Sequence, residues 1–458
     1  MINNGLRPYE EYKVIDLPWL DTVPSHWNIR RNKNVMIQNK YLVGLNHYQY
    51  KLLSLTLKGV IARDMVNPKG KFPKEFDTYQ VVGEKDLVFC LFDIDETPRT
   101  VGISPMDGMI TGAYTVFKAR NANEKFLYYY YLAMDNNKMM KPLYTGLRKV
   151  ISSDTFLRTK LPIPPRQEQD QIVKYLDYQL AKINKFIKAK KKQIAALKEQ
   201  KQVIINEAVI KGLDTQAKMK YSEIEWLGDV PEHWEITRIK WLFSEKDERK
   251  SDKDLELLTF SRKKGLILYS EYSEKPPSAK DLSEYKVVRP GDLLMNKMQA
   301  WSGMFTDVCT TGVVSPDYSV FKPTNIAHVG FYSLVFRTER HVQQFALASK
   351  GIGSGFNRLY TPSFGSIYTV LPPFDEQMAI VENINKKTLG INTSIYVIEK
   401  EIELISEYKG SLISDVVTGK VDVRNIIIED IKEIEIDDQE FDEEPIEEEI
   451  LDIEDGDE

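Results

Sequence analysis

One short segment combines side chains that could read the edges of DNA bases. Residues 296–303, NKMQAWSG, follow the strand-like run GDLLM and contain Lys297, Gln299 and Trp301. Lysine can donate to guanine O6 and N7, glutamine can read adenine N6 and N7, and an aromatic ring can stack or wedge. An ordinary polar loop that packs one tryptophan would look the same, so the segment alone leaves both interpretations open.

Basic residues gather in further loops that suit phosphate contacts. GLRKVIS and GFNRLYT match each other in the two halves of the chain, and this recurrence favours a functional role. Two other clusters, KGKFPK at 69–74 and RKKG at 262–265, suit either DNA contacts or solvated loops. The candidate residues in these four loops are Arg148, Lys149, Asn357, Arg358, Lys69, Lys71, Arg262, Lys263 and Lys264.

We find no catalytic constellation in the sequence. It has no G-x-x-x-x-G-K-[ST] phosphate loop, G-x-S-x-G elbow, H-E-x-x-H helix or kinase signature. The five histidines are scattered, and His26 and His233 sit in a repeated P-x-H-W motif that favours a structural role. LPPF at 371–374 lacks the leading Asn or Asp of the adenine-methyltransferase tetrad. We therefore expect no catalytic or metal site, since an enzyme would need a cluster assembled from separate loops.

The chain is a duplication of one long unit. PWLDTVPSHWNIRRNK at 18–33 recurs as EWLGDVPEHWEITRIK at 225–240, so that Trp27 matches Trp234. Further collinear matches follow at nearly the same offset, which chance does not produce. The stretches 38–80 and 245–286 share almost no sequence. The two copies therefore keep a common structural framework and differ in part of their surface. The remaining matches are VVGEKDLVF with VVRPGDLLM, YTVFK with YSVFK, LPIPPRQEQ with VLPPFDEQ, and 168–214 with 376–422.

Each copy ends in a long helical segment with an apolar seam. Apolar residues alternate three and four apart from Val173 to Ile204 and from Val381 to Leu412, a pattern typical of coiled coils. Because the helices occupy equivalent points of a duplicated chain, we expect them to pair antiparallel about a pseudo-two-fold axis. Lys190, Lys201 and Lys409 fall on the seam, where they could set the register or extend to solvent.

The fold class that follows is α+β, with two tandem domains separated by two long helices that form an antiparallel coiled coil. Short β-rich runs punctuated by Gly, Pro and Asp fill each globular half. The predicted segments are a first domain at 1–165, a central helix at 166–214, a second domain at 215–373, a distal helix at 374–422, and an acidic, disordered tail at 423–458.

Charge is segregated along the chain. Residues 429–458 hold eighteen acidic residues and one lysine, a net charge of −17, whereas residues 1–428 hold 61 basic and 50 acidic residues, a net charge of +11. A basic body permits nucleic-acid binding but does not prove it. Two distant cysteines exclude a disulfide framework, and without a signal peptide or an 18-residue apolar run we expect a cytoplasmic protein.

Taken in order and in duplicate, these motifs resemble the specificity subunits of type I restriction–modification systems. The resemblance covers roughly 12–422 and rests on P-x-H-W, GDLLMNKMQAWSG, SPDYSVFK, GFNRLYTPSFGSI and LPPFDEQ. The first copy departs from the pattern, because CLFDIDETPRT replaces the NKMQAWSG loop and TGAY replaces SPDY.

The resemblance implies that each globular half is a target-recognition domain that reads one half of a bipartite double-stranded DNA site. It also implies a non-catalytic subunit whose helices dock two modification (methyltransferase) subunits. Those partners would bind S-adenosylmethionine, and restriction (translocase–nuclease) subunits could join them. The alternative is an interaction scaffold, with two protein-binding domains on a coiled coil and little affinity for DNA.

Overall fold

The computed structural model describes residues 6–65, 76–144, 149–249, 255–262, 264–273, 282–351 and 357–428. The chain divides into two compact units, unit 1 with residues 1–190 and 400–458, and unit 2 with residues 191–399. Two long helices, α3 (Arg166–Lys211) and α8 (Phe374–Val417), each contribute a part to both units. Four candidate residues, Lys69, Lys71, Arg148 and Lys263, lie outside the described residues, as does the acidic segment 429–458.

Unit 1 is built around a four-stranded antiparallel sheet with the order β4-β11-β8-β9. Three smaller pairs, β1-β2, β3-β12 and β7-β10, and the hairpin β5-β6 accompany it. Helix α1 (Glu124–Asn136) follows β11 and supplies much of the core. The other elements are β1 (Tyr12–Leu17), β2 (Leu20–Pro24), β3 (Asn28–Arg31), β4 (Met36–Asn39), β5 (Leu53–Thr56), β6 (Gly59–Ala62), β7 (Gln80–Val82), β8 (Leu87–Phe89), β9 (Val101–Ile103), β10 (Gly108–Ile110), β11 (Thr115–Ala119), α2 (Ser153–Arg158) and β12 (Lys160–Ile163).

Unit 2 repeats this strand topology. Its four-stranded sheet has the order β16-β23-β20-β21. The smaller pairs of unit 1 correspond to β13-β14, β15-β24, β19-β22 and the hairpin β17-β18. The elements are β13 (Met219–Tyr221), β14 (Asp229–Pro231), β15 (Glu235–Arg238), β16 (Phe243–Lys246), β17 (Leu258–Ser261), β18 (Gly265–Leu268), α4 (Tyr269–Tyr272), β19 (Lys286–Val288), β20 (Leu293–Asn296), β21 (Phe305–Asp307), β22 (Gly312–Val314), β23 (Tyr318–Pro323), α5 (Val329–Val335), α6 (Glu339–Ala348), α7 (Thr361–Ser366) and β24 (Tyr368–Leu371).

The stretches that diverge in sequence nevertheless form equivalent hairpins, β5-β6 and β17-β18. In each unit one glycine allows the backbone just before the hairpin to pack closely against the neighbouring strand. A Cβ on Gly108 would lie 2.6 Å from the carbonyl oxygen of Lys51, and one on Gly312 would lie 2.8 Å from that of Glu256. Close backbone approach thus requires glycine at both places, although the surrounding side chains differ.

Both long helices begin after a proline pair and end at a glycine. The pairs at 164–165 and 372–373 precede α3 and α8, because proline disfavours helical backbone in the residue before it. Gly212 and Gly419 follow the helices with φ of +75° and +77°, the left-handed conformation that closes a helix at little cost for glycine.

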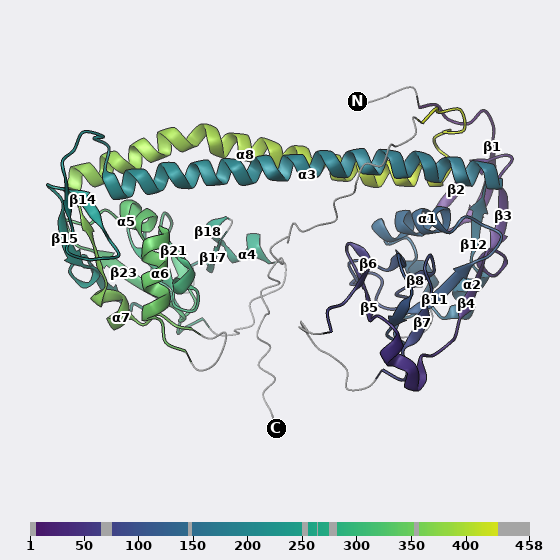
Figure 1. The fold of residues 1–458 in the computed structure, drawn as a ribbon, viewed down its shortest axis with the longest axis horizontal. Coiled ribbons are helices and arrows are strands. Elements are labelled where there is room, and N and C mark those ends of the chain that lie inside the picture. Colours follow the sequence, from purple (N-terminus) through teal and green to yellow (C-terminus); the bar gives the residue numbers. More distant parts are fainter. Residues whose placement is uncertain are drawn as a thin grey trace. The chain divides into compact units, whose positions relative to one another are not determined.

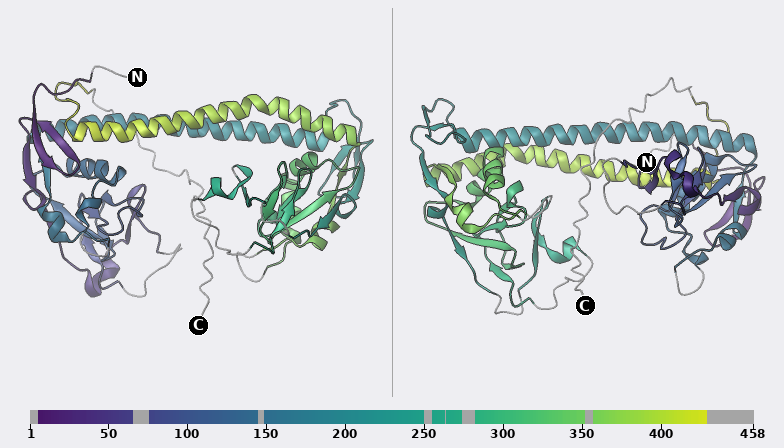
Figure 2. Two further views of the ribbon diagram at one scale, coloured as in Figure 1. Left: turned by 180° about the vertical axis from the view of Figure 1, so that it is seen from behind. Right: turned by 60° about the horizontal axis from the view of Figure 1, so that its bottom comes forward.

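Within each unit α3 and α8 pack side by side and antiparallel (Figures 1 and 2). In unit 1 the ammonium of Lys409 donates to Asn184, and in unit 2 that of Lys201 donates to Asn392. The predicted seam residues are buried or half-buried throughout, as Leu176 and Ile384 illustrate at 0% and 2% exposure. The predicted coiled-coil pairing is confirmed.

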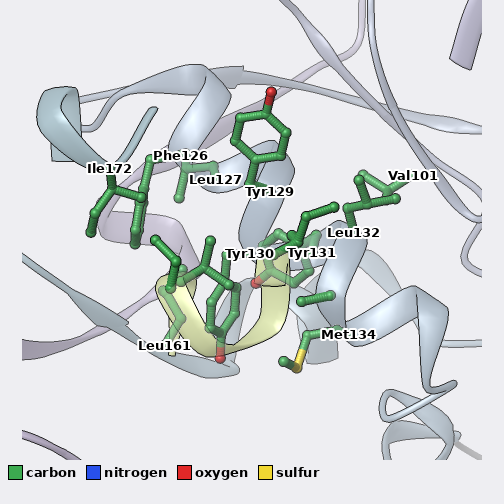
Figure 3. Close-up of a cluster of buried hydrophobic side chains, with 14 of the residues drawn as sticks. Val101, Phe126, Leu127, Tyr129, Tyr130, Tyr131, Leu132, Met134, Leu161 and Ile172 are labelled. Atoms are coloured by element: carbon green, nitrogen blue, oxygen red, sulfur yellow. The ribbon is translucent and has the colours of Figure 1, made fainter. Parts of the chain in front are cut away.

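Aromatic side chains dominate the core of unit 1. Asn123 caps α1 by accepting from the amides of Lys125 and Phe126, and the helix then directs Phe126, Tyr130 and other large side chains inward (Figure 3). The hydroxyl of Tyr131 donates to Asn32 at 2.6 Å, which satisfies a phenol that is otherwise fully enclosed.

Candidate nucleic-acid interface

The NKMQAWSG segment forms the connection between β20 and β21 at the edge of the unit 2 sheet. Its start is held by backbone bonds: Lys297 N donates to Asp317 O, and Leu359 N donates to Lys297 O at 3.1 Å. Its end turns at Gly303, which has φ of +82° and whose Cβ position lies 3.0 Å from Val342. The loop between these points is therefore fixed by the sheet and by the segment around residue 359.

Lys297 lies partly inside this loop. Its ammonium donates to the carbonyl of Pro316 at 3.1 Å, and burial lowers the pKa of Lys297. Because burial makes the charged ammonium of Lys297 less stable, a nearby anion such as a phosphate would stabilise it. Lys297 thus combines a structural bond with a cationic surface.

Trp301 is exposed and Gln299 is half-buried. Trp301 is 42% exposed, and its indole N–H already donates to Met298 O at 2.9 Å, so the ring face rather than the N–H is available. The side-chain amide of Gln299 makes no hydrogen bond with another described residue. One aromatic surface and one amide are therefore available to a ligand from the same turn.

Two arginines from other segments border the loop. Arg358 approaches Met298, with its Nε 2.8 Å from the sulfur, and lies 3.8 Å from the carboxylate of Asp317. Arg262, which follows β17, donates to the hydroxyl of Ser302 at 2.6 Å. The structure thus brings Lys297, Gln299, Trp301, Arg358 and Arg262 together, which the sequence had placed in three separate segments. We call these five residues the basic cluster.

Two further candidates of unit 2 flank this region in sequence. Lys264, in the turn between β17 and β18, and Asn357, next to Arg358, are both exposed. The contact of each with DNA stays a prediction.

Unit 1 contains an equivalent loop at 91–98, within the CLFDIDETPRT segment that replaces NKMQAWSG in the first copy. Ile151 N donates to Leu91 O at 2.7 Å, in the same way that Leu359 N donates to Lys297 O. Three residues after these acceptors, Ile94 and Ala300 are both fully buried. The two loops share one frame, and Asp93, Asp95 and Glu96 occupy the places of Gln299, Trp301 and Ser302. We call residues 91–98 the acidic loop.

Lys149, a predicted DNA contact, is held by the acidic loop. Its ammonium lies 2.6 Å from Glu96 and 3.1 Å from Asp95, and these bonds raise the pKa of Lys149. Hydrogen bonds from Tyr144, at 2.7 Å, and from Lys149 lower the pKa of Asp95 to about 2. A DNA phosphate would have to compete with two carboxylates for this ammonium.

The repeated P-x-H-W motif has a structural role, as predicted for its histidines. In unit 1, His26 and Trp27 bond to the carboxylate of Glu168 at 2.7 Å and 2.8 Å, and Tyr9 donates to it at 2.6 Å. In unit 2 the corresponding bonds join Glu376 to His233 at 2.8 Å and to Trp234 at 3.1 Å. The motif thus attaches the first turn of each long helix to its domain.

Across the described residues, no group of three or more histidine, cysteine, aspartate or glutamate side chains is arranged to hold a metal ion. Over the same part of the chain, none of the helices has the length and apolarity needed to span a membrane.

Comparison with known proteins supports the resemblance found in the sequence. Residues 100–196 match the model of the type I restriction modification DNA specificity domain. The chain is 24% identical to the type I restriction enzyme MjaVIII specificity subunit of Methanocaldococcus jannaschii, over 92% of this chain and 96% of that protein. Over nearly its whole length, the chain is therefore similar to a type I specificity subunit.

Two further comparisons agree with this assignment. The putative type I restriction enzyme MjaX specificity subunit of the same organism is 26% identical over 58% of this chain and 60% of that protein. A solved chain from a study of complex assembly and conformational transition of the type I R-M system has the same fold. That chain has a TM-score of 0.57 and 13% identity, over 87% of this chain and 99% of its own length. The tandem α+β architecture is shared with that chain.

Proposed function

We propose that this specificity subunit reads a bipartite double-stranded DNA site, one half with each unit. The observation that carries the proposal is the pair of equivalent loops, which share a backbone frame but present different side chains. The basic cluster joins a lysine, two arginines, a glutamine and an exposed tryptophan around one loop. Arginine, lysine and glutamine are the donors that read guanine and adenine in the major groove. A protein-binding scaffold would not need this set at the equivalent point of a duplicated fold.

The methyl-transfer chemistry belongs to partners in this proposal. Two modification subunits bind S-adenosylmethionine and act on adenine, and restriction subunits can join the complex. The specificity subunit itself is not catalytic, and the assembly works in the cytoplasm.

Exposed apolar residues on the long helices support a docking role. Leu389, Tyr396 and Leu404 on α8 are 67%, 62% and 63% exposed, and Phe186 on α3 is 43% exposed. Large exposed apolar side chains are typical of surfaces that bind other proteins. Two other aromatics of α3 are less exposed, and of these Tyr175 is only 4% exposed and belongs to the core of unit 1. Tyr178 is half-buried beneath Lys182.

The test is methylome sequencing of cells that express the subunit with its modification partner. We expect one methylated motif with two specified halves and an unspecified spacer. Replacing residues 245–365 with the corresponding segment of a relative should change one half and leave the other. A change in both halves would contradict independent reading, and an absent motif would contradict the function.

A second experiment distinguishes a DNA-recognising subunit from a protein-interaction scaffold. Binding of the purified subunit to random DNA should fall steeply with salt, because phosphate contacts release counterions. The isolated chain should also transfer no methyl group from labelled S-adenosylmethionine to DNA.

A further inference from the structure

The seam between α3 and α8 contains one polar pair that occurs twice. In unit 1, Nζ of Lys409 donates to Oδ1 of Asn184 at 2.9 Å. In unit 2, Nζ of Lys201 donates to Oδ1 of Asn392 at 2.8 Å. Lys409 follows Lys201 by 208 residues, and Asn392 follows Asn184 by the same 208 residues. The two hydrogen bonds are therefore equivalent interactions in the two halves of the duplicated chain.

The two pairs also agree on a single antiparallel register. From the first pair to the second, α3 advances by 17 residues, from 184 to 201, while α8 recedes by 17, from 409 to 392. A lysine that merely extended to solvent would have no reason to meet an asparagine of the other helix at both equivalent positions. Lys190 and Glu401, 2.6 Å apart, lie in the same stretch of unit 1.

An apolar seam alone specifies register poorly, because a slipped helix still places apolar residues opposite apolar residues. A single Lys or Asn on a coiled-coil seam fixes register at some cost in stability. Lys201 and Lys409 are half-buried, and this burial lowers the pKa of both. A slip would leave each ammonium partly desolvated without its acceptor, so the correct register is favoured.

We propose that the Lys201–Asn392 and Lys409–Asn184 pairs are positioning residues that fix the helix register and thereby the number of unspecified base pairs between the half-sites. The proposal rests on the bipartite function proposed above. One helical turn of slip moves a helix by about 5.4 Å. Since base pairs are spaced about 3.4 Å along DNA, that displacement corresponds to one or two base pairs of spacer.

The decisive variant is Lys201→Met with Lys409→Met, which keeps the aliphatic stems and removes both donors. We expect methylation to spread to sites whose spacer differs by one or two base pairs, with an increase in their fraction of about tenfold or more, as the loss of one polar contact allows. Thermal stability should be retained or raised, because methionine adds apolar contact at these half-buried seam positions and leaves only exposed asparagines without their partners. A purely stabilising role would give the opposite result, a lower melting temperature with one spacer.

Two controls complete the design. Exchanging donor and acceptor between the helices, with Lys201→Asn, Asn392→Lys, Asn184→Lys and Lys409→Asn, should restore the single spacer. Lys185→Met with Lys198→Met, at exposed positions of α3, should leave the spacer unchanged.

The register can also be measured without DNA. Spin labels at Lys198→Cys and Tyr396→Cys, both exposed residues of unit 2, report the helix offset in full-length protein with Cys309→Ser. We expect one distance in the parental background and a second population in the double methionine variant. One unchanged distance together with one unchanged spacer would overturn the proposal. A parental chain that directs no bipartite methylation, but shows the second distance when both lysines are replaced, would refute the proposed function and leave the register device standing.

Discussion

The acidic loop of unit 1 and the basic cluster of unit 2 occupy equivalent places but differ in charge. The backbone bonds from Ile151 to Leu91 and from Leu359 to Lys297 give both loops the same anchor. Beyond that anchor, one loop presents carboxylates that hold Lys149, and the other presents a tryptophan and an amide beside two arginines. The frame has been kept while the chemistry of the exposed positions has changed.

This difference indicates how two copies of one fold could recognise different base sequences. Carboxylates can accept from the amino group of cytosine but repel phosphates, whereas arginine and lysine suit guanine and also phosphates. We therefore expect unit 2 to supply more of the salt-dependent affinity than unit 1.

The largest effect should follow from disabling the basic cluster. Replacing Arg358 and Gln299 with alanine should weaken binding to the cognate DNA by about two orders of magnitude, since each specific base contact contributes about 1–3 kcal/mol. Fluorescence anisotropy with cognate and random duplexes would measure it.

The matched change in unit 1 replaces Lys149 and Asp93 with alanine. Because Lys149 is already paired with two carboxylates, the loss should be less than about threefold, the scale of an exposed ion pair. Equal losses from the two units would remove the asymmetry on which the comparison rests.

The next effect concerns the attachment of the long helices. The side chain of Glu168 is 5% exposed and accepts from Tyr9, His26 and Trp27. The side chain of Glu376 is 23% exposed and accepts from His233 and Trp234. Glu168→Gln should cost about 2–3 kcal/mol of unfolding free energy and Glu376→Gln about 1 kcal/mol, in line with bonds to charged groups. Urea unfolding followed by fluorescence would compare them, and a larger cost at Glu376 would contradict the expectation.

Much of this architecture could be predicted because its signals are periodic or repeated. The seam from Val173 to Ile204 and the recurrence of Trp27 as Trp234 were enough to predict two domains and a helix pair. The hairpins β5-β6 and β17-β18 could not be matched by sequence, because their equivalence lies in backbone approach at Gly108 and Gly312. The approach of Arg262 to Ser302 depends on tertiary folding, which no local pattern encodes. The sequence identified CLFDIDETPRT as the counterpart of NKMQAWSG, but it could not show that Asp95 and Glu96 hold Lys149, because that contact depends on tertiary folding.

A smaller effect should follow from neutralising the acidic loop. Asp95→Asn with Glu96→Gln removes two negative charges and releases Lys149 for phosphates. We expect affinity for random DNA at low salt to rise about two- to fivefold, with a salt slope steeper by about one unit. Glu10→Gln, a neutralisation of another exposed carboxylate of unit 1, should leave both quantities unchanged. An unaltered slope in the double variant would mean that this loop does not face DNA.

The smallest and most conditional effect concerns the acidic C-terminal segment. Residues 429–458 carry a net charge of −17. They follow Ile426 and Ile428, which pack against the core of unit 1. The side chain of Gln171 also donates to the carbonyl of Ile426 at 2.8 Å. Closely spaced carboxylates can compete with DNA phosphates for basic side chains, but only over a Debye length of about 10 Å at 0.1 M salt. Truncation after Ile428 should therefore tighten binding to random DNA by about two- to threefold at low salt, and the gain should vanish at high salt. If the competition is for the basic cluster, the gain should also vanish in the Arg358→Ala, Gln299→Ala variant, whereas the acidic loop variant should retain it. Equal affinity of truncated and full-length protein at every salt concentration would leave the segment without a role in DNA binding.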